Sequence, residues 1–260
     1  MEKQPEMQFA GPLLRLADPA GAGEWFSQKL GLSLTEGKEA LTAVSGGCRI
    51  YLEKDPDPAP AQTAAEGYYT GLAHIAFRST DLPASVRICT ARGAQLAGGE
   101  QISYNPGIWG TGMDYVNPLC PFGVGMEISQ RLDLPAGPME QATDGLEHIG
   151  IPVAQIEESV AWYRSLGFEK ASGTEIHRED GAQIFCVMMS GYGVILELFE
   201  FAGMAHEPMR GQPFAALVFE TGALADWQAF CAARGIPCEK TAEGLALTGP
   251  CGETLLLCER

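Results

Sequence analysis

The chain has 260 residues, of which 46% are apolar, and its 33 acidic and 17 basic side chains give a formal charge of −16. This length and composition predict a soluble globular protein with a full hydrophobic core. The acidic balance argues against nucleic acid or an anionic membrane as a partner, because phosphate binding depends on clustered lysine and arginine. No apolar run approaches the roughly 20 residues that cross a bilayer, and the N-terminus lacks a secretory signal pattern, so we expect a cytoplasmic protein.

Four successive segments repeat one order of elements, which is a strand, a helix and then three strands. The predicted units are residues 1–54, 71–130, 145–201 and 211–260, with proline-containing linkers between them. The first and third units share an aromatic-rich helix that ends in Leu-Gly, whereas the second and fourth share Ala-Arg-Gly at the same place. The chain therefore contains a duplicated A–B pair of modules.

The elements are clearest in the third unit. Its first strand is predicted over 146–153 and its helix over 156–166, where apolar residues recur on one face. Gly167 suits the left-handed conformation that ends a helix. The remaining elements are three strands at 168–177, 182–190 and 194–201, with a hairpin turn at 178–181 after the first of them.

A histidine and a glutamate recur in the second and third units. His74 and His148 lie in near-identical first strands, and Glu127 and Glu197 lie in the apolar last strands of the same units. By strand alternation, His148 shares a face with Leu146 and Gly150. Since a carboxylate among apolar neighbours is unfavourable to bury alone, each glutamate is expected to have a partner, and a metal ion is the simplest one. Glu127 is expected to share its face with Gly125 and Ser129, and Glu197 with Ile195 and Phe199.

This pattern resembles the vicinal oxygen chelate superfamily over nearly the whole chain; the superfamily includes glyoxalase I, methylmalonyl-CoA epimerase, extradiol dioxygenases and bleomycin-resistance proteins. The resemblance implies an α+β fold in which four βαβββ modules pair into two curled eight-stranded half-barrels. It implies that the second and third modules form an active barrel and the outer two a degenerate one. The implied metal ligands are His74, Glu127, His148 and Glu197.

The outer modules lack these ligands in the sequence. Alignment of the first strands places Gly11 and Ala216 at the histidine positions. In the last strands, Leu52 and either Leu255 or Leu256 fall near the glutamate positions.

Two imidazoles and two carboxylates suit a divalent cation such as Ni²⁺, Zn²⁺, Co²⁺, Mn²⁺ or Fe²⁺. The ligand set is most similar to that of glyoxalase I, which implies a lyase or isomerase that removes a proton next to a metal-bound carbonyl by way of an enediolate. In that reaction Glu127 is expected to be the principal base and Glu197 the second acid or base. Extradiol dioxygenases of the superfamily resemble one another in using two histidines and one glutamate. The alternatives are an epimerase or dioxygenase of the superfamily, or a non-catalytic small-molecule-binding protein of the resistance type.

The substrate is less constrained than the metal chemistry. Pro152 stands where glyoxalase I commonly carries an arginine for the glutathione carboxylate, so another activated carbonyl compound is as plausible as a hemithioacetal. Arg78, four residues after His74, is a candidate for an anionic substrate group or else a rim arginine. The segment 103–115 either forms a wall of a cleft or packs its aromatic residues on the degenerate barrel of the outer modules. Its candidates for substrate contact are Tyr104, Trp109 and Tyr115. Because one chain holds both halves of the site, it can act as a monomer or a homodimer.

Overall fold

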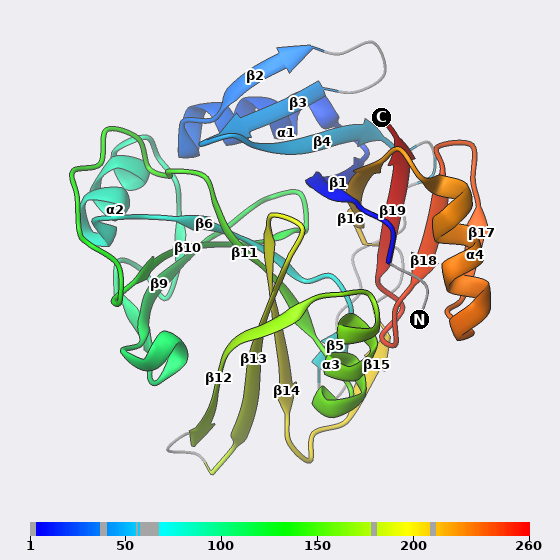
Figure 1. Cartoon of the computed structure of the whole chain (residues 1–260). Coiled ribbons are helices and arrows are strands. Elements are labelled where there is room, and N and C mark those ends of the chain that lie inside the picture. The colour runs from blue at the N-terminus through cyan, green and yellow to red at the C-terminus, as the bar shows by residue number, and fades with distance from the viewer. Residues whose placement is uncertain (1–3, 37–40, 56, 58–67, 178–180, 209–211) are drawn as a thin grey trace.

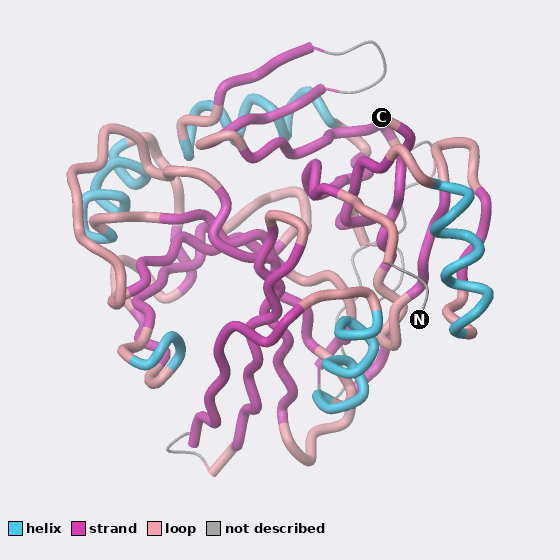
Figure 2. The backbone as a smooth tube through the Cα atoms, viewed as in Figure 1, coloured by secondary structure: helices cyan, strands magenta, loops and turns pink. Residues whose placement is uncertain are grey.

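The computed structural model describes residues 4–36, 41–55, 57, 68–177, 181–208 and 212–260. Most of the predicted hairpin turn, residues 178–180, lies outside the described residues. Two large curled, open sheets make up the fold, and helices cover their outer faces (Figures 1 and 2). The α+β class and the curled half-barrels predicted from the sequence are confirmed.

The first sheet combines strands from the two ends of the chain. Its strand order is β17-β18-β19-β16-β1-β4-β3-β2, with β1 antiparallel to β16 at the centre. Two helices pack on this sheet, α1 (Pro19–Trp25) and α4 (Leu224–Arg234). Helix α1 continues as the π-helix η1 (Phe26–Leu30). The strands are β1 (Gln8–Leu16), β2 (Ser33–Glu36), β3 (Leu41–Ser45), β4 (Cys48–Lys54), β16 (Phe214–Thr221), β17 (Cys238–Lys240), β18 (Leu245–Thr248) and β19 (Thr254–Glu259).

The second sheet comes from the middle of the chain, in the order β12-β13-β14-β11-β6-β10-β9-β7. It has nine strands instead of the expected eight, because the short β8 pairs with β9 beside β7. Its helices are α2 (Leu82–Ala91) and α3 (Ile156–Ser165), and η2 (Ile108–Gly110) is a 3-10 turn. The strands are β6 (His74–Arg78), β7 (Leu96–Ala97), β8 (Ser103–Asn105), β9 (Met113–Pro118), β10 (Gly125–Arg131), β11 (Leu146–Pro152), β12 (Glu169–His177), β13 (Gln183–Gly191) and β14 (Val194–Phe201). A separate parallel ribbon joins β5 (Tyr68–Thr70) to β15 (His206–Pro208).

Local sequence signals fix the ends of several helices. Asp18 and Asp81 cap α1 and α2, and their side chains accept hydrogen bonds from the backbone N–H groups three residues later. A proline in the first turn follows each aspartate, where its missing N–H has no helical partner to lose. Gly167, with a φ of 88°, follows α3 in the left-handed conformation predicted from the sequence.

The hydrophobic core is continuous between the two sheets. Phe219 of the first sheet makes edge-on contacts with Phe168, just before β12, and with Tyr192, in the turn between β13 and β14; the ring centroids are 6.4 Å apart in each case. The strands alternate as predicted, so that Leu196 and Leu198 of β14 face this core beneath the helices. The concave faces of the sheets lie opposite this core and can therefore carry a binding site. No helix in the described part of the chain has the length and hydropathy needed to cross a bilayer.

A buried polar contact also ties the two halves together. The hydroxyl of Tyr163 on α3 donates to a carboxylate oxygen of Glu253, which precedes β19, at 3.0 Å. The other carboxylate oxygen accepts from the backbone N–H of Cys251 at 2.9 Å. Burial raises the pKa of Glu253, because little of its side chain reaches water to solvate the charge.

We expect Tyr163→Phe to lower the free energy of unfolding by about 1–3 kcal/mol near neutral pH, because a buried carboxylate oxygen loses its donor. The folded chain holds the Glu253 proton to a higher pH than the unfolded chain, so the stability that this group contributes falls as the pH rises from the unfolded to the folded pKa. The effect of Tyr163→Phe should therefore shrink in acid, where the carboxyl group is neutral. Urea unfolding at two pH values, with the exposed Tyr104→Phe as control, measures it; an equal loss at both would contradict the role of Glu253.

Candidate metal centre

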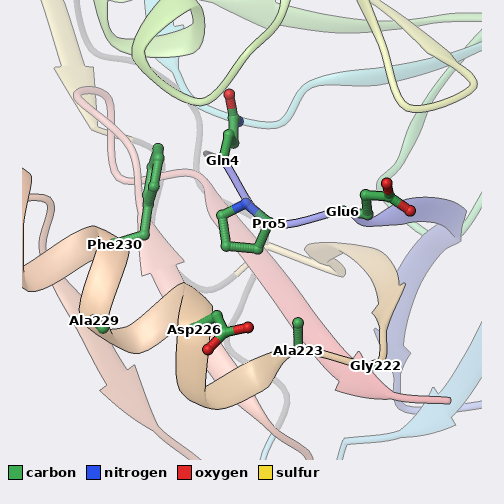
Figure 3. Close-up of a pocket in the computed structure, with 8 residues that line it drawn as sticks. All are labelled: Gln4, Pro5, Glu6, Gly222, Ala223, Asp226, Ala229 and Phe230. Carbon is green, nitrogen blue, oxygen red and sulfur yellow. The ribbon is translucent and has the colours of Figure 1, made fainter. Parts of the chain in front are cut away.

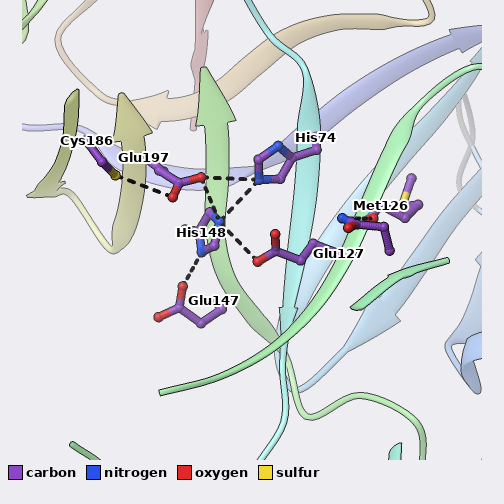
Figure 4. A network of polar contacts seen from close by, with 8 residues as sticks. His74, Met126, Glu127, Glu147, His148, Cys186 and Glu197 are labelled. Atoms are coloured by element: carbon purple, nitrogen blue, oxygen red, sulfur yellow. Dashed lines mark hydrogen bonds and ion pairs between the residues drawn. The ribbon is translucent and has the colours of Figure 1, made fainter. Parts of the chain in front are cut away.

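Four side chains predicted as metal ligands meet on the concave face of the second sheet. They come from the adjacent strands β14, β11, β6 and β10 at its centre, where β11 and β6 run antiparallel and each pairs in parallel with the last strand of its own unit. In Figure 4 these side chains point toward one another across the two central strands. The residues are His74 on β6, Glu127 on β10, His148 on β11 and Glu197 on β14.

The donor atoms lie close together. The Nε2 atoms of His74 and His148 are 3.2 Å apart, and Oε2 of Glu197 lies 3.5 Å from the first and 3.4 Å from the second. Oε1 of Glu127 is 3.6 Å from His148 Nε2. His74, Glu127 and His148 offer ligand atoms that all lie within 4.8 Å of one another.

Two glycines make room for the His74 side chain. A Cβ atom at Gly150 on the neighbouring strand would stand 1.9 Å from Cε1 of the His74 imidazole. A Cβ atom at Gly125 on the other side would stand 2.6 Å from the backbone oxygen of Ala73 and 2.8 Å from Cβ of His74. The ring can therefore lie across β11 toward His148 only because Gly150 carries no side chain, and Gly125 lets β10 pass close to the base of the His74 side chain.

Glu147 is a site residue that the sequence pattern missed. The pairing of β11 with β6 shifts between Leu146 and His148, so a β-bulge interrupts the expected alternation. Leu146 packs against the core, and the prediction that it shares a face with His148 is wrong. The bulge lets the buried Glu147 carboxylate contact Nδ1 of His148. By accepting a hydrogen bond from Nδ1–H it would leave Nε2 to offer its lone pair to a cation bound among the other three side chains.

The two predicted glutamates are held differently. Glu197 contacts both histidines, and its Oε1 also accepts a hydrogen bond from the buried Cys186 thiol at 3.5 Å. Glu127 Oε1 is buried and accepts no hydrogen bond. Their strand neighbours follow the predicted alternation, with Ile195 and Phe199 beside Glu197 on the concave face.

Burial and mutual charge shift the pKa values of these groups strongly. Burial lowers the pKa of His74 to about 4, against the opposing charge of Glu197. Burial also raises the pKa of Glu127 to about 8, although His148 opposes it. For Glu197 the effect of burial is outweighed by the charge and hydrogen bond of His148, which lower the pKa to about 2. A divalent cation among the donors would favour ionised carboxylates and neutral imidazoles.

The donor set fits such a cation. Two imidazole nitrogens and two carboxylate oxygens are the ligands of borderline divalent metals, and a cation about 2.0–2.2 Å from each would separate neighbouring donors by roughly 2.8–3.6 Å. The separations of 3.2–3.6 Å match this spacing. The buried, unpartnered oxygen of Glu127 is a further sign that a positive group belongs here.

A cavity of about 790 Å³ opens beside the donors and is lined by His74, Glu127 and Glu197. Of the predicted substrate-contact residues, Tyr104 and Tyr115 line it, whereas Arg78 and Trp109 do not. Arg78 pairs with Asp144 at 3.2 Å. The Trp109 ring stacks under the Arg131 guanidinium, and its backbone N–H donates to Ser172 on β12, so this tryptophan packs on the second sheet itself.

A different cavity, of about 590 Å³, lies between the N-terminal segment and α4 (Figure 3). Its lining carries two carboxylates, Glu6 and Asp226, but no histidine or cysteine. Of these two cavities, only the cavity of the second sheet has histidine, glutamate and cysteine side chains together in its lining.

The first sheet has no comparable donors at the matching positions among its described strands. In the second sheet, Glu197 pairs with Gly150, which lies two residues after His148. In the first sheet, the residues two positions after Gly11 and Ala216 are Leu13 and Val218, and they pair with Tyr51 and Leu256. Tyr51 and Leu256 thus occupy the glutamate positions, and the alignment of Leu52 with that position is wrong because Leu52 faces the core.

Comparison with known proteins supports this architecture. Residues 145–244 match the family model Glyoxalase/Bleomycin resistance protein/Dioxygenase superfamily. Glyoxalase I from Zea mays superimposes with a TM-score of 0.71 at 15% identity, covering 98% of this chain and 92% of that one. A proposed dioxygenase from Bacillus subtilis superimposes with a TM-score of 0.67 at 12% identity, covering 99% and 86%. No curated protein sequence matches the chain significantly.

The chain therefore contains a domain of the glyoxalase/bleomycin resistance/dioxygenase superfamily, which confirms the resemblance seen in the sequence. At these identities the superimposed structures establish the fold. The activity has to be argued from the site.

We expect Glu147→Gln to weaken binding of Zn²⁺ or Ni²⁺ about tenfold, because the His148 imidazole loses the charge that orients it and raises its basicity. Competition titration against a chromophoric chelator measures this. Glu175→Gln is the matched control, since that carboxylate also contacts a histidine, His177, but on the exposed surface. Equal affinities in the Glu147 variant and the wild type would contradict the role of Glu147.

Gly150→Ala should abolish metal binding as completely as His74→Ala while leaving the fold intact. The added methyl group meets the far end of the His74 ring, which can turn away, and the Gly150 backbone does not require glycine. Gly222→Ala, where a Cβ atom meets nothing within 4 Å, is the control. Metal content by elemental analysis, with circular dichroism for folding, tests this; a Gly150→Ala protein with full metal content would refute the steric argument.

Proposed function

We propose that this chain is a divalent-metal-dependent enzyme of the glyoxalase type, a lyase or isomerase that removes a proton from the carbon next to a carbonyl group. The observation that carries the proposal is the convergence of two histidines and two glutamates beside a cavity large enough for a small molecule. A bound divalent cation would supply Lewis-acid polarisation of the carbonyl, which makes the neighbouring proton more acidic. His74, Glu127, His148 and Glu197 are the residues that would hold it.

Glu127 is the proposed base. Its Oε1 accepts no hydrogen bond and lies 3.6 Å from Nε2 of His148, so the carboxylate is held by fewer contacts than that of Glu197 and can turn toward a substrate carbon. Glu197 is held by both histidines and by Cys186, which suits a fixed ligand and a secondary role in returning the proton. Return to the neighbouring carbon gives isomerisation, and return to the opposite face of the same carbon gives epimerisation.

A metal-dependent dioxygenase is the second candidate. Two histidines and one glutamate, His74, His148 and Glu127, offer ligand atoms within 4.8 Å of one another, and this is the kind of set that the resemblance implies for extradiol dioxygenases. The proposed dioxygenase from Bacillus subtilis also shares the fold. Consumption of O₂ distinguishes this reaction from proton transfer.

We expect Glu127→Gln to slow the exchange of substrate α-protons with D₂O at least about 100-fold, because the variant lacks the base. The measurement is proton NMR of a panel of small 2-oxo compounds with the Ni²⁺- or Zn²⁺-loaded protein, and again with Fe²⁺ without oxygen. Glu157→Gln, on the exposed first turn of α3, is the control. Wild-type exchange in Glu127→Gln would overturn the assignment of the base. Failure of the wild type to bind any metal would overturn the proposed function.

A further inference from the structure

We infer that the cavity of the second sheet takes an uncharged ligand with an apolar body the size of an aromatic ring, rather than an anionic conjugate. This inference rests on the proposed function because it concerns the same site. It follows from three features of the cavity wall, which are its rings, its charges and one unpartnered amide.

Aromatic rings lead outward from the candidate metal centre. The Phe199 ring lies beside the His74 imidazole with centroids 6.1 Å apart, and Phe201 follows at 5.7 Å from Phe199. Both phenylalanines line the cavity, and its lining also includes Ile102, Tyr104, Pro106 and Tyr115 from β8, β9 and the loops beside β8. If a ligand's carbonyl group lies at the candidate metal ligands, an apolar group attached to it would pack against these side chains and be buried from water.

No lysine or arginine lines the cavity among the described residues. Arg78 is paired with Asp144, and Arg131 is occupied by Asp133 and the Trp109 ring. The donor cluster itself contains three carboxyl groups, those of Glu127, Glu147 and Glu197, which together exceed the charge of one divalent cation. Among the described residues, therefore, a carboxylate on a ligand would find no positive charge to spare.

One polar group in the wall lacks a partner. The side-chain oxygen of Asn105 is buried and makes no hydrogen bond, and Asn105 lines the cavity. A neutral hydroxyl or amide N–H of a ligand would satisfy this acceptor, whereas a carboxylate would not. An uncharged ligand that carries a hydrogen-bond donor beside its apolar body would suit this wall better than an anionic one.

Three hydroxamic acids test the inference by calorimetry on the Zn²⁺-loaded protein. Acetohydroxamic acid has the chelating group alone, benzohydroxamic acid adds a neutral ring, and 4-carboxybenzohydroxamic acid adds a negative charge to that ring. We expect benzohydroxamic acid to bind at least about tenfold more tightly than each of the others, since the ring buries apolar surface and the carboxylate has no counter-charge. A carboxylated compound that binds as tightly as the neutral one, or an acetohydroxamic acid that matches it, would overturn the inference.

Substitution at Ile184 provides the matched variants. This residue lines the cavity on β13 and is partly exposed, so a longer side chain can be accommodated. Ile184→Arg should reverse the preference in favour of the carboxylated compound, and Ile184→Met should leave it unchanged. An unchanged order of affinities in a folded Ile184→Arg protein would contradict a charge-based preference at this wall.

Two ketones that bind without a metal ion allow this inference to be tested independently of the proposed function. Acetophenone and 4-carboxyacetophenone do not depend on chelation, and saturation-transfer NMR with the chelator-treated protein detects their binding. If Zn²⁺ fails to bind but acetophenone is still preferred, the proposed function fails and the inference about the wall stands. If Zn²⁺ binds and the anionic ketone is preferred, the function stands and the inference fails.

Discussion

The central constraint in this molecule is the antiparallel contact between β6 and β11. Each strand is the first of its unit and pairs on its other side with the last strand of that unit, so one contact brings four strands of two repeats together. Side chains at equivalent positions of the two repeats then meet on the concave face, and His74 and His148 face each other across the contact. The candidate site exists because this pairing brings together two half-sites that lie far apart along the chain.

Such a meeting of ionisable groups opposes folding unless something compensates it. Buried carboxylates and imidazoles lose hydration, and the pKa of Glu127, raised to about 8, reflects that loss. The convex face supplies the compensation, because Ile75, Ile149 and Leu196 alternate with the polar positions and are fully buried in the core. The candidate site and the hydrophobic core thus occupy opposite faces of the same strands.

Much of this follows from the sequence, and the gaps have physical causes. Strand alternation placed Glu127 and Glu197 on the concave face because β10 and β14 pair without a register shift. It failed at Glu147, because a β-bulge depends on the pairing of two strands and leaves no mark on the one that carries it. The Trp109 ring is held by Arg131, a partner distant in sequence that composition does not reveal. The four module boundaries and the ligand roles of individual residues remain predictions.

The two sheets show what the polar cluster requires of a protein. At matching positions the first sheet has Gly11, Ala216, Tyr51 and Leu256, which pack with few ionisable groups to desolvate. Apolar residues at such positions are often as stabilising as a buried charged cluster, or more so. The first sheet, joined to the second through Phe219 and through the Tyr163–Glu253 contact, can therefore supply stability that the second sheet gives up at its centre. The duplication predicted from the sequence permits this division, because each copy of the module pair contributes one module to the sheet that holds the ionisable groups and one to the sheet that lacks them.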